Sequence, residues 1–166
     1  MDQAQGALDA ARAAGADRYA ADEYKAAATA LNNARDAVAQ RDYRLALNHA
    51  LDSRERAQAA AKQAADQQAA QRSAAERRLG EVAALLDLAN QKLAAARVAR
   101  APARLLAPPR SAIVAAETSL QKAGTLITSG DYGESQKQLA DATAQLRAAL
   151  GQVGALMGGR GARPRR

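Results

Sequence analysis

The sequence predicts an all-α protein: an elongated antiparallel helical bundle built from two copies of one helical hairpin, which a long helix joins. Three observations lead to this prediction. Alanine, the strongest helix former, fills 49 of the 166 positions. Apolar residues recur every three or four positions through most of the chain, which is typical of helices with one buried face. Finally, residues 20–64 and 109–153 repeat one pattern at an offset of 89 positions.

The repeat is centred on an Asp-Tyr pair, at residues 42–43 in the first copy and 131–132 in the second. Apolar or small residues superpose on both sides of this pair. In the first copy they are Tyr24, Ala27, Leu31, Ala34, Val38, Ala46, Ala50, Ser53, Ala57 and Ala60. In the second copy they are Ile113, Ala116, Leu120, Ala123, Ile127, Ser135, Leu139, Ala142, Leu146 and Ala149. Spacings of three and four on each side of a fixed turn predict a helical hairpin.

The first part of the chain is predicted to contain a short helix over residues 2–14, which Gly15 ends, and a second helix over 19–40. Glycine stops helices well because it adopts the left-handed conformation without strain. Neither Pro nor Gly occurs between Asp42 and Gly80. Residues 42–100 therefore either form one long helix or bend where the apolar stripe fails, between about residues 65 and 78.

The second part is predicted to begin with a loop over residues 101–109. Helices over 110–129 and 131–156 then form the second hairpin, and Pro109 suits the start of a helix because its missing N–H has no partner there. Four segments follow from this pattern. They are a first helical repeat over 1–64, a solvated helical connector over 65–80, a second helical repeat over 81–156 and a disordered basic tail over 157–166.

The hairpin turn carries the clearest local signal. In the second copy, Gly130 is predicted to end one helix and Asp131 to cap the next, with Glu134 completing a capping box. In the first copy Asp42 keeps the cap, but Arg41 stands in place of the glycine. The Asp-Tyr pair has two interpretations: a corner that contacts a ligand, or a cap with an aromatic ring over the hairpin end. The second is favoured because Asp is a preferred N-cap residue.

The net charge of +7 is unevenly distributed. Residues 1–64 are neutral, residues 65–110 carry a net charge of +4, and residues 111–150 carry −1. The tail adds +4 through Arg160, Arg163, Arg165 and Arg166. The tail is either an arm that contacts an anionic ligand or a solubilising end. A basic linker and tail, without a concentrated basic face, make nucleic acid an unfavoured partner.

Composition argues against several chemistries. The chain has no cysteine and one histidine, so we expect no catalytic residues, no metal site and no cofactor. No glycine-rich phosphate loop follows a strand. No run of about 18 apolar residues occurs, so no membrane-spanning segment is expected. The sequence thus predicts a protein that is not an enzyme.

The segment from Ala11 to Tyr24, followed by Leu31, Ala34 and Arg41-Asp42-Tyr43, resembles a family of alanine-rich bacterial domains of unknown function. These domains occur in envelope lipoproteins, sometimes before an OmpA-like peptidoglycan-binding domain. The resemblance covers about residues 4–64 and, more faintly, 93–153. The chain departs from the pattern at Ala20-Ala21, where the family has Ala-Pro. The resemblance implies export to the periplasm, a lipid anchor upstream of this chain as the link to a membrane, and no catalytic residues.

We therefore expect a non-enzymatic helical scaffold or a module that binds a partner protein in the bacterial cell envelope. A cytoplasmic nucleic-acid-associated protein, acting through the basic connector region over residues 72–110 and the arginine tail, is the alternative. A peptide-binding tetratricopeptide array is a weaker third hypothesis, because the 34-residue period and its markers are missing. The identity of the partner and the oligomeric state do not follow from the sequence.

The predicted cap gives a first test. Replacing Asp131 with Ala should lower the free energy of unfolding of the second hairpin by roughly 1 kcal/mol, a typical loss for an N-cap. Urea denaturation followed by circular dichroism measures the change. An unchanged midpoint would mean that Asp131 does not cap the helix.

Overall fold

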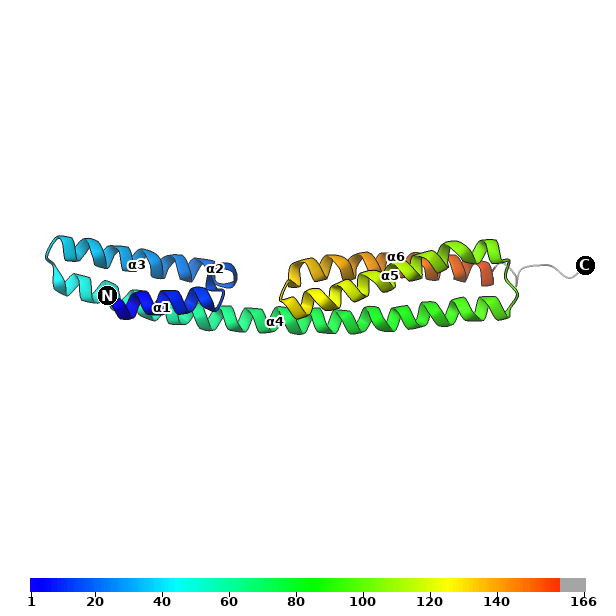
Figure 1. Cartoon of the computed structure of the whole chain (residues 1–166), viewed down its shortest axis with the longest axis horizontal. Helices are drawn as coiled ribbons and strands as arrows, with labels where there is room; N and C mark the ends of the chain where they lie inside the picture. Colours follow the sequence, from blue (N-terminus) through cyan, green and yellow to red (C-terminus); the bar gives the residue numbers. More distant parts are fainter. Residues whose placement is uncertain (159–166) are drawn as a thin grey trace, which may run out of the picture. The chain divides into compact units, whose positions relative to one another are not determined.

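The computed structural model describes residues 1–158 and is 92% helix, without a strand in that range. The prediction of an all-α fold is therefore confirmed. The helices are α1 (Asp2–Ala13), α2 (Ala16–Tyr19), α3 (Ala21–Ala39), α4 (Tyr43–Val98), α5 (Ala103–Ser129) and α6 (Tyr132–Gly158). The chain divides into two compact units, Met1–Gln71 and Arg72–Arg166, and α4 contributes residues to both (Figure 1).

In the first unit, α1 packs against the hairpin of α3 and the first part of α4 (Figure 1). The core has little large apolar surface, because all but two of its fully buried members are alanine. They are Ala4, Leu8, Ala11, Ala16, Ala20, Ala27, Leu31, Ala57, Ala60 and Ala64. Such small side chains bring the helix backbones close together. The buried hydroxyl of Ser53 on α4 accordingly donates a hydrogen bond to the carbonyl oxygen of Ala27 on α3, at 2.8 Å.

In the second unit, the later part of α4 packs against the hairpin of α5 and α6 (Figure 1). Its core holds more large side chains than that of the first unit. The buried members are Val82, Ala89, Leu93, Ala96, Leu106, Ile113, Ala116, Ala123, Leu139, Ala142, Leu146, Ala149 and Val153. Leu139, Leu146 and Val153 are among the largest fully buried side chains, so α6 supplies much of the apolar area buried here.

The two hairpin turns have the same backbone geometry, although their sequences differ at a key position. The N–H of Asp42 donates to the carbonyl of Ala37 and the N–H of Asp131 to that of Leu126, at 3.0 and 2.9 Å. Each bond is the long one of a Schellman motif. The motif needs a left-handed residue, which is Gly130 at φ 83° in one copy and Arg41 at φ 62° in the other.

Aspartate caps the second helix of both hairpins. The N–H of Leu45 donates to Asp42 Oδ1 at 3.0 Å, and the N–H of Glu134 donates to Asp131 Oδ1 at 3.2 Å. The reciprocal half of the predicted capping box was wrong. The Asp131 N–H already donates within the Schellman motif, and the Glu134 carboxylate instead accepts hydrogen bonds from the side chains of Lys137 and Gln138.

Helix α4 is continuous, which decides between the two alternatives for residues 42–100. Residues 65–73 are exposed all round, as a solvated connector should be. The predicted connector was nevertheless too long, because Ala75 is buried against Ile127 and Tyr132 and Leu79 packs beside them. The second unit therefore includes part of the predicted connector.

The predicted loop over residues 101–109 was also wrong, because α5 begins at Ala103 and contains Pro108 and Pro109. Proline inside a helix removes hydrogen bonds, but its fixed φ is compatible with helical geometry. The burial of Leu106 and Pro109 in the core of the second unit offsets this loss. A further difference is α2, a single turn between Gly15 and Ala20 that the sequence did not predict, because the second helix was expected to begin at residue 19.

The two tyrosines of the repeat lie in different environments. Tyr132 is 6% exposed and packs on α4, whereas Tyr43 is 67% exposed. Val38 is 40% exposed, although its counterpart Ile127 is buried. The prediction of an aromatic ring over the hairpin end therefore holds for the second copy and was wrong for the first. The predicted stripe likewise fails at Val38, and Ala37 is buried instead.

Arg41 is expected to strain the first turn, because left-handed backbone is unfavourable for residues with a Cβ. Replacing Arg41 with Gly should raise the free energy of unfolding of the first unit by up to roughly 1 kcal/mol. The reverse change, Gly130→Ala, should destabilise the second unit by a similar amount, since nothing lies within 4 Å of the added Cβ and only the conformation is affected. Opposite signs in urea denaturation would support this assignment, and equal signs would contradict it.

The different burial of the two tyrosines predicts very different mutational effects. Replacing Tyr132 with Ala should destabilise the second unit by roughly 3 kcal/mol, a typical loss for a buried aromatic side chain. Replacing Tyr43 with Ala should change the stability of the first unit by less than about 0.5 kcal/mol. Thermal unfolding of the two variants compares them directly, and similar losses would show that Tyr43 is covered in solution.

Candidate functional site at the basic end of the second unit

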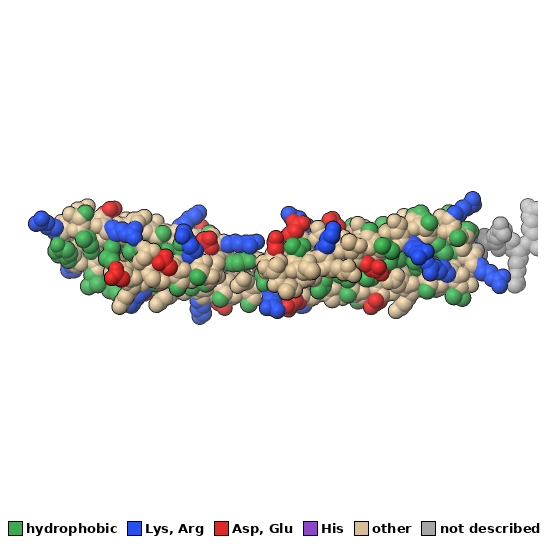
Figure 2. All heavy atoms as spheres, in the orientation of Figure 1, with side chains coloured by type: hydrophobic (Ala, Val, Ile, Leu, Met, Phe, Trp, Pro, Cys, Tyr) green, Lys and Arg blue, Asp and Glu red, His purple; other side chains and the backbone are tan. Residues whose placement is uncertain are grey.

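Among the described residues, one end of the second unit carries basic side chains without acidic ones. Residues 88–116 span the end of α4, the following turn and the first half of α5, and contain no Asp or Glu. Their charged residues are Lys92, Arg97, Arg100, Arg104 and Arg110. Helix α6, whose C-terminus lies at the same end, has no acidic residue after Asp141 in the described range (Figure 1). On the visible face of this end, the charged side chains are all those of Lys or Arg (Figure 2).

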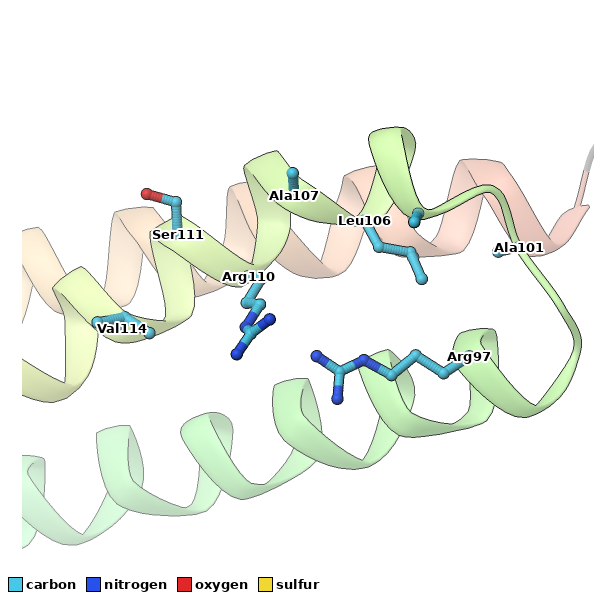
Figure 3. Close-up of a pocket in the computed structure, with 8 residues that line it drawn as sticks. Arg97, Ala101, Leu106, Ala107, Arg110, Ser111 and Val114 are labelled. Atoms are coloured by element: carbon cyan, nitrogen blue, oxygen red, sulfur yellow. The ribbon is translucent and has the colours of Figure 1, made fainter.

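A hollow of about 750 Å³ opens between α4 and α5 at this basic end. Arg97 of α4 and Arg110 of α5 extend into it from opposite sides, and their guanidinium groups face each other (Figure 3). Within residues 1–158, neither side chain has an ion-pair partner. Two guanidinium groups that face each other without a carboxylate nearby produce a local positive potential that favours an anion.

Local sequence explains how the two arginines come together. Arg97 lies in the last turn of α4, where a cation interacts favourably with the helix dipole. The chain then reverses through Arg100, whose φ is 56°, and the N–H of Ala101 donates to the carbonyl of Ala96 at 3.0 Å. Because Pro109 is buried in the core, the next residue, Arg110, is directed away from the core. The α4–α5 turn therefore places Arg97 and Arg110 on facing helices.

The walls of the hollow combine apolar and polar groups. Its lining consists of Arg97, Ala101, Ala103, Leu106, Ala107, Arg110, Ser111 and Val114. A guanidinium group offers paired N–H donors that match a carboxylate or a phosphate. Alanine, leucine and valine side chains next to these donors suit a ligand whose anionic group is attached to an apolar portion. The arrangement is chemically competent to bind such an anion.

The residues that the sequence reading singled out lie elsewhere. Gly130, Asp131 and Glu134 meet at the α5–α6 turn, at the other end of α5 from the hollow, and Asp42 lies at the α3–α4 turn. Hydrogen bonds from Lys137 and Gln138 lower the pKa of the exposed Glu134 carboxyl group. Asp131 and Asp42 cap the starts of α6 and α4, and Gly130 ends α5, as predicted. Glu134 lies in the first turn of α6, but its side chain does not act as a cap. Arg160, Arg163, Arg165 and Arg166 lie outside the described residues.

Other kinds of site receive no support from the described part of the chain. No three His, Asp or Glu side chains within residues 1–158 are grouped so that they could hold a metal ion. Among the helices of the same range, none is long and apolar enough to cross a membrane.

Arg97 and Arg110 were not predicted as site residues, because the net charge of residues 65–110 is lowered by four acidic residues before position 88. The run from 88 to 116 without any acid was the available signal. The hollow itself gave no signal, since it depends on how the α4–α5 turn orients two helices.

Comparison with known proteins adds no relative: the chain matches no family model, no curated protein sequence and no solved structure. The resemblance to alanine-rich envelope domains therefore stays a prediction, and function is argued from the site alone.

Proposed function

We propose that this chain is a non-enzymatic helical module of the bacterial cell envelope that binds an acidic partner protein at the basic end of its second unit. The observation that carries the proposal is the pair of facing guanidinium groups of Arg97 and Arg110, in a hollow whose described lining residues include no carboxylate. The envelope location rests on the sequence resemblance. The two scaffold-like units supply rigid helices on which such a binding end is held.

Charge and shape together favour an acidic protein segment as the partner. A glutamate or aspartate side chain would replace the water around the arginines with charge-assisted hydrogen bonds, which are stronger than neutral ones. Leu106 and Val114 offer apolar contacts to neighbouring side chains of the partner. Clusters of arginine that recognise acidic motifs are a recurrent way of binding peptides.

The lining of the hollow supports binding rather than catalysis. Ser111 contributes a hydroxyl group, but the described lining residues include no histidine or carboxylate that would act as a general base. Hydroxyl nucleophiles need such a base to become reactive. The hollow therefore has groups that can hold an anion, but its described lining residues lack a base that would activate the Ser111 hydroxyl.

Nucleic acid is the second candidate, because Lys92, Arg97, Arg100, Arg104 and Arg110 form a basic cluster. Against it, residues 88–116 contain no aromatic side chain on which a base would stack. Binding of nucleic acid at this end would therefore depend on phosphate contacts and fall steeply with salt.

The proposal is tested by fluorescence anisotropy at about 150 mM salt, near the physiological value. The probes are a labelled peptide rich in glutamate and leucine and a labelled single-stranded DNA of equal net charge. The double variant Arg97→Gln/Arg110→Gln should weaken peptide binding at least tenfold, or about 1.4 kcal/mol. As a matched control, Arg77→Gln/Lys122→Gln removes the same charge from the second unit but leaves the hollow intact.

Equal losses in both double variants would show that net charge, and not the hollow, accounts for binding. A chain that ends at Met157 should keep its affinity for the peptide. Tight DNA binding that disappears on this truncation would favour the nucleic-acid function instead. Cell fractionation of the natural protein tests the envelope location separately.

A further inference from the structure

An apolar surface of the first unit is left uncovered at the tip of the α3–α4 hairpin. Val38 and Tyr43 lie on the two sides of the turn, and Leu47, one helical turn after Tyr43, is 59% exposed. Leu45 and Leu51, in the first turns of α4, are also large apolar side chains that are exposed. Figure 2 shows hydrophobic side chains gathered at this end of the first unit.

The surface is uncovered because α1 is too short to reach the tip. Helix α1 has 12 residues and α3 has 19, a difference of roughly 10 Å in length. The beginning of α1 is held by hydrogen bonds from Arg35 to Gln5, at 2.8 Å, and from Arg54 to Gln3, at 3.1 Å. Helix α3 continues past Arg35 to Ala39, and α4 begins about three turns before Arg54. In Figure 1 the N-terminus correspondingly stops short of the α3–α4 turn.

The second unit shows what covers the equivalent surface. Ile127 and Tyr132, which match Val38 and Tyr43 in the repeat, are 8% and 6% exposed. They pack against Ala75 of α4, and Leu79, one turn later, packs beside them. A helix with a small residue followed four positions later by leucine therefore fits this hairpin tip. The small residue allows the helix to approach the tyrosine ring closely.

We propose that Val38, Tyr43 and Leu47 form a groove that binds an amphipathic helix of a partner protein, with Ala and Leu four positions apart on its apolar face. The groove continues the seam in which α1 packs between α3 and α4, so a helix is the element that extends it. Arg41 and Arg44 are exposed at the same tip and favour acidic residues on the polar face of the incoming helix. This site is separate from the basic end of the second unit and does not depend on the function proposed there.

The experiment uses the full chain and a labelled synthetic peptide with the sequence of residues 72–90, which contains the covering segment of the second unit. Anisotropy should report saturable binding, and the substitutions Tyr43→Asp and Leu47→Asp should each weaken it at least tenfold. A control peptide with Asp in place of Leu79 should not bind. Circular dichroism should show unchanged helix content for both protein variants, because the side chains that they replace are exposed.

Leu45→Asp is the matched control on the protein. Leu45 is 42% exposed on the same turn of α4, but about 200° around the helix from Leu47. It should bind the peptide within about twofold of the unchanged chain. Equal losses for Leu45→Asp and Leu47→Asp, or no saturable binding by the unchanged chain, would overturn the proposal. Concentration-dependent dimerisation that Leu47→Asp abolishes, seen by sedimentation, would identify a second copy as the occupant and would also overturn it.

Discussion

The fold depends on close packing between helices whose buried faces are largely alanine. Each buried alanine removes little apolar area from water, so stability comes from many small contacts along long seams. The Ser53 hydroxyl can reach the carbonyl of Ala27 on the neighbouring helix only because no large side chain separates the two backbones. Because the cores are thin, the burial of each hairpin depends on how far the helix packed against it extends. This helix is α1 in the first unit and α4 in the second.

The two units show how the two copies of one hairpin pattern differ. Both copies keep the Schellman motif and the aspartate cap, which are properties of the turn itself. They differ in the helix that covers the tip. In the second unit α4 reaches Tyr132 and buries it. In the first unit the N-terminal end of α1 does not extend as far as Tyr43. The reach of the covering helix thus accounts for one tyrosine being a core residue and the other a surface residue.

The same comparison separates the two surfaces to which we assign binding. At the basic end of the second unit, Arg97 and Arg110 have no ion-pair partner within residues 1–158, and selectivity there rests on charge and hydrogen bonding. The tip of the first unit exposes apolar side chains, and its selectivity rests on shape and the size of the facing residue. One surface favours association steered by electrostatics, which salt weakens, and the other favours contacts that salt leaves nearly unchanged.

The sequence alone determined that the chain is helical and where its two hairpin turns lie. It also determined that Asp42 and Asp131 cap the helices that follow these turns. These features depend on residues within four or five positions of one another, and their physical causes are local: alanine propensity, three-four periodicity and the hydrogen bonds of Asp42 and Asp131. The sequence also located the solvated part of α4, because a helix without an apolar stripe has nothing to bury.

The tertiary structure decided which of these local features are covered. Proline at 108 and 109 argued for a loop, but burial of Pro109 in the core keeps α5 helical through both residues. Val38 and Ile127 occupy the same repeat position and differ in burial only because of a helix distant in sequence. Arg97 and Arg110 face each other across a turn whose geometry no spacing rule encodes. For Pro109 and for Val38 the deciding interaction joins residues far apart in the chain, and local pattern carries no information about it.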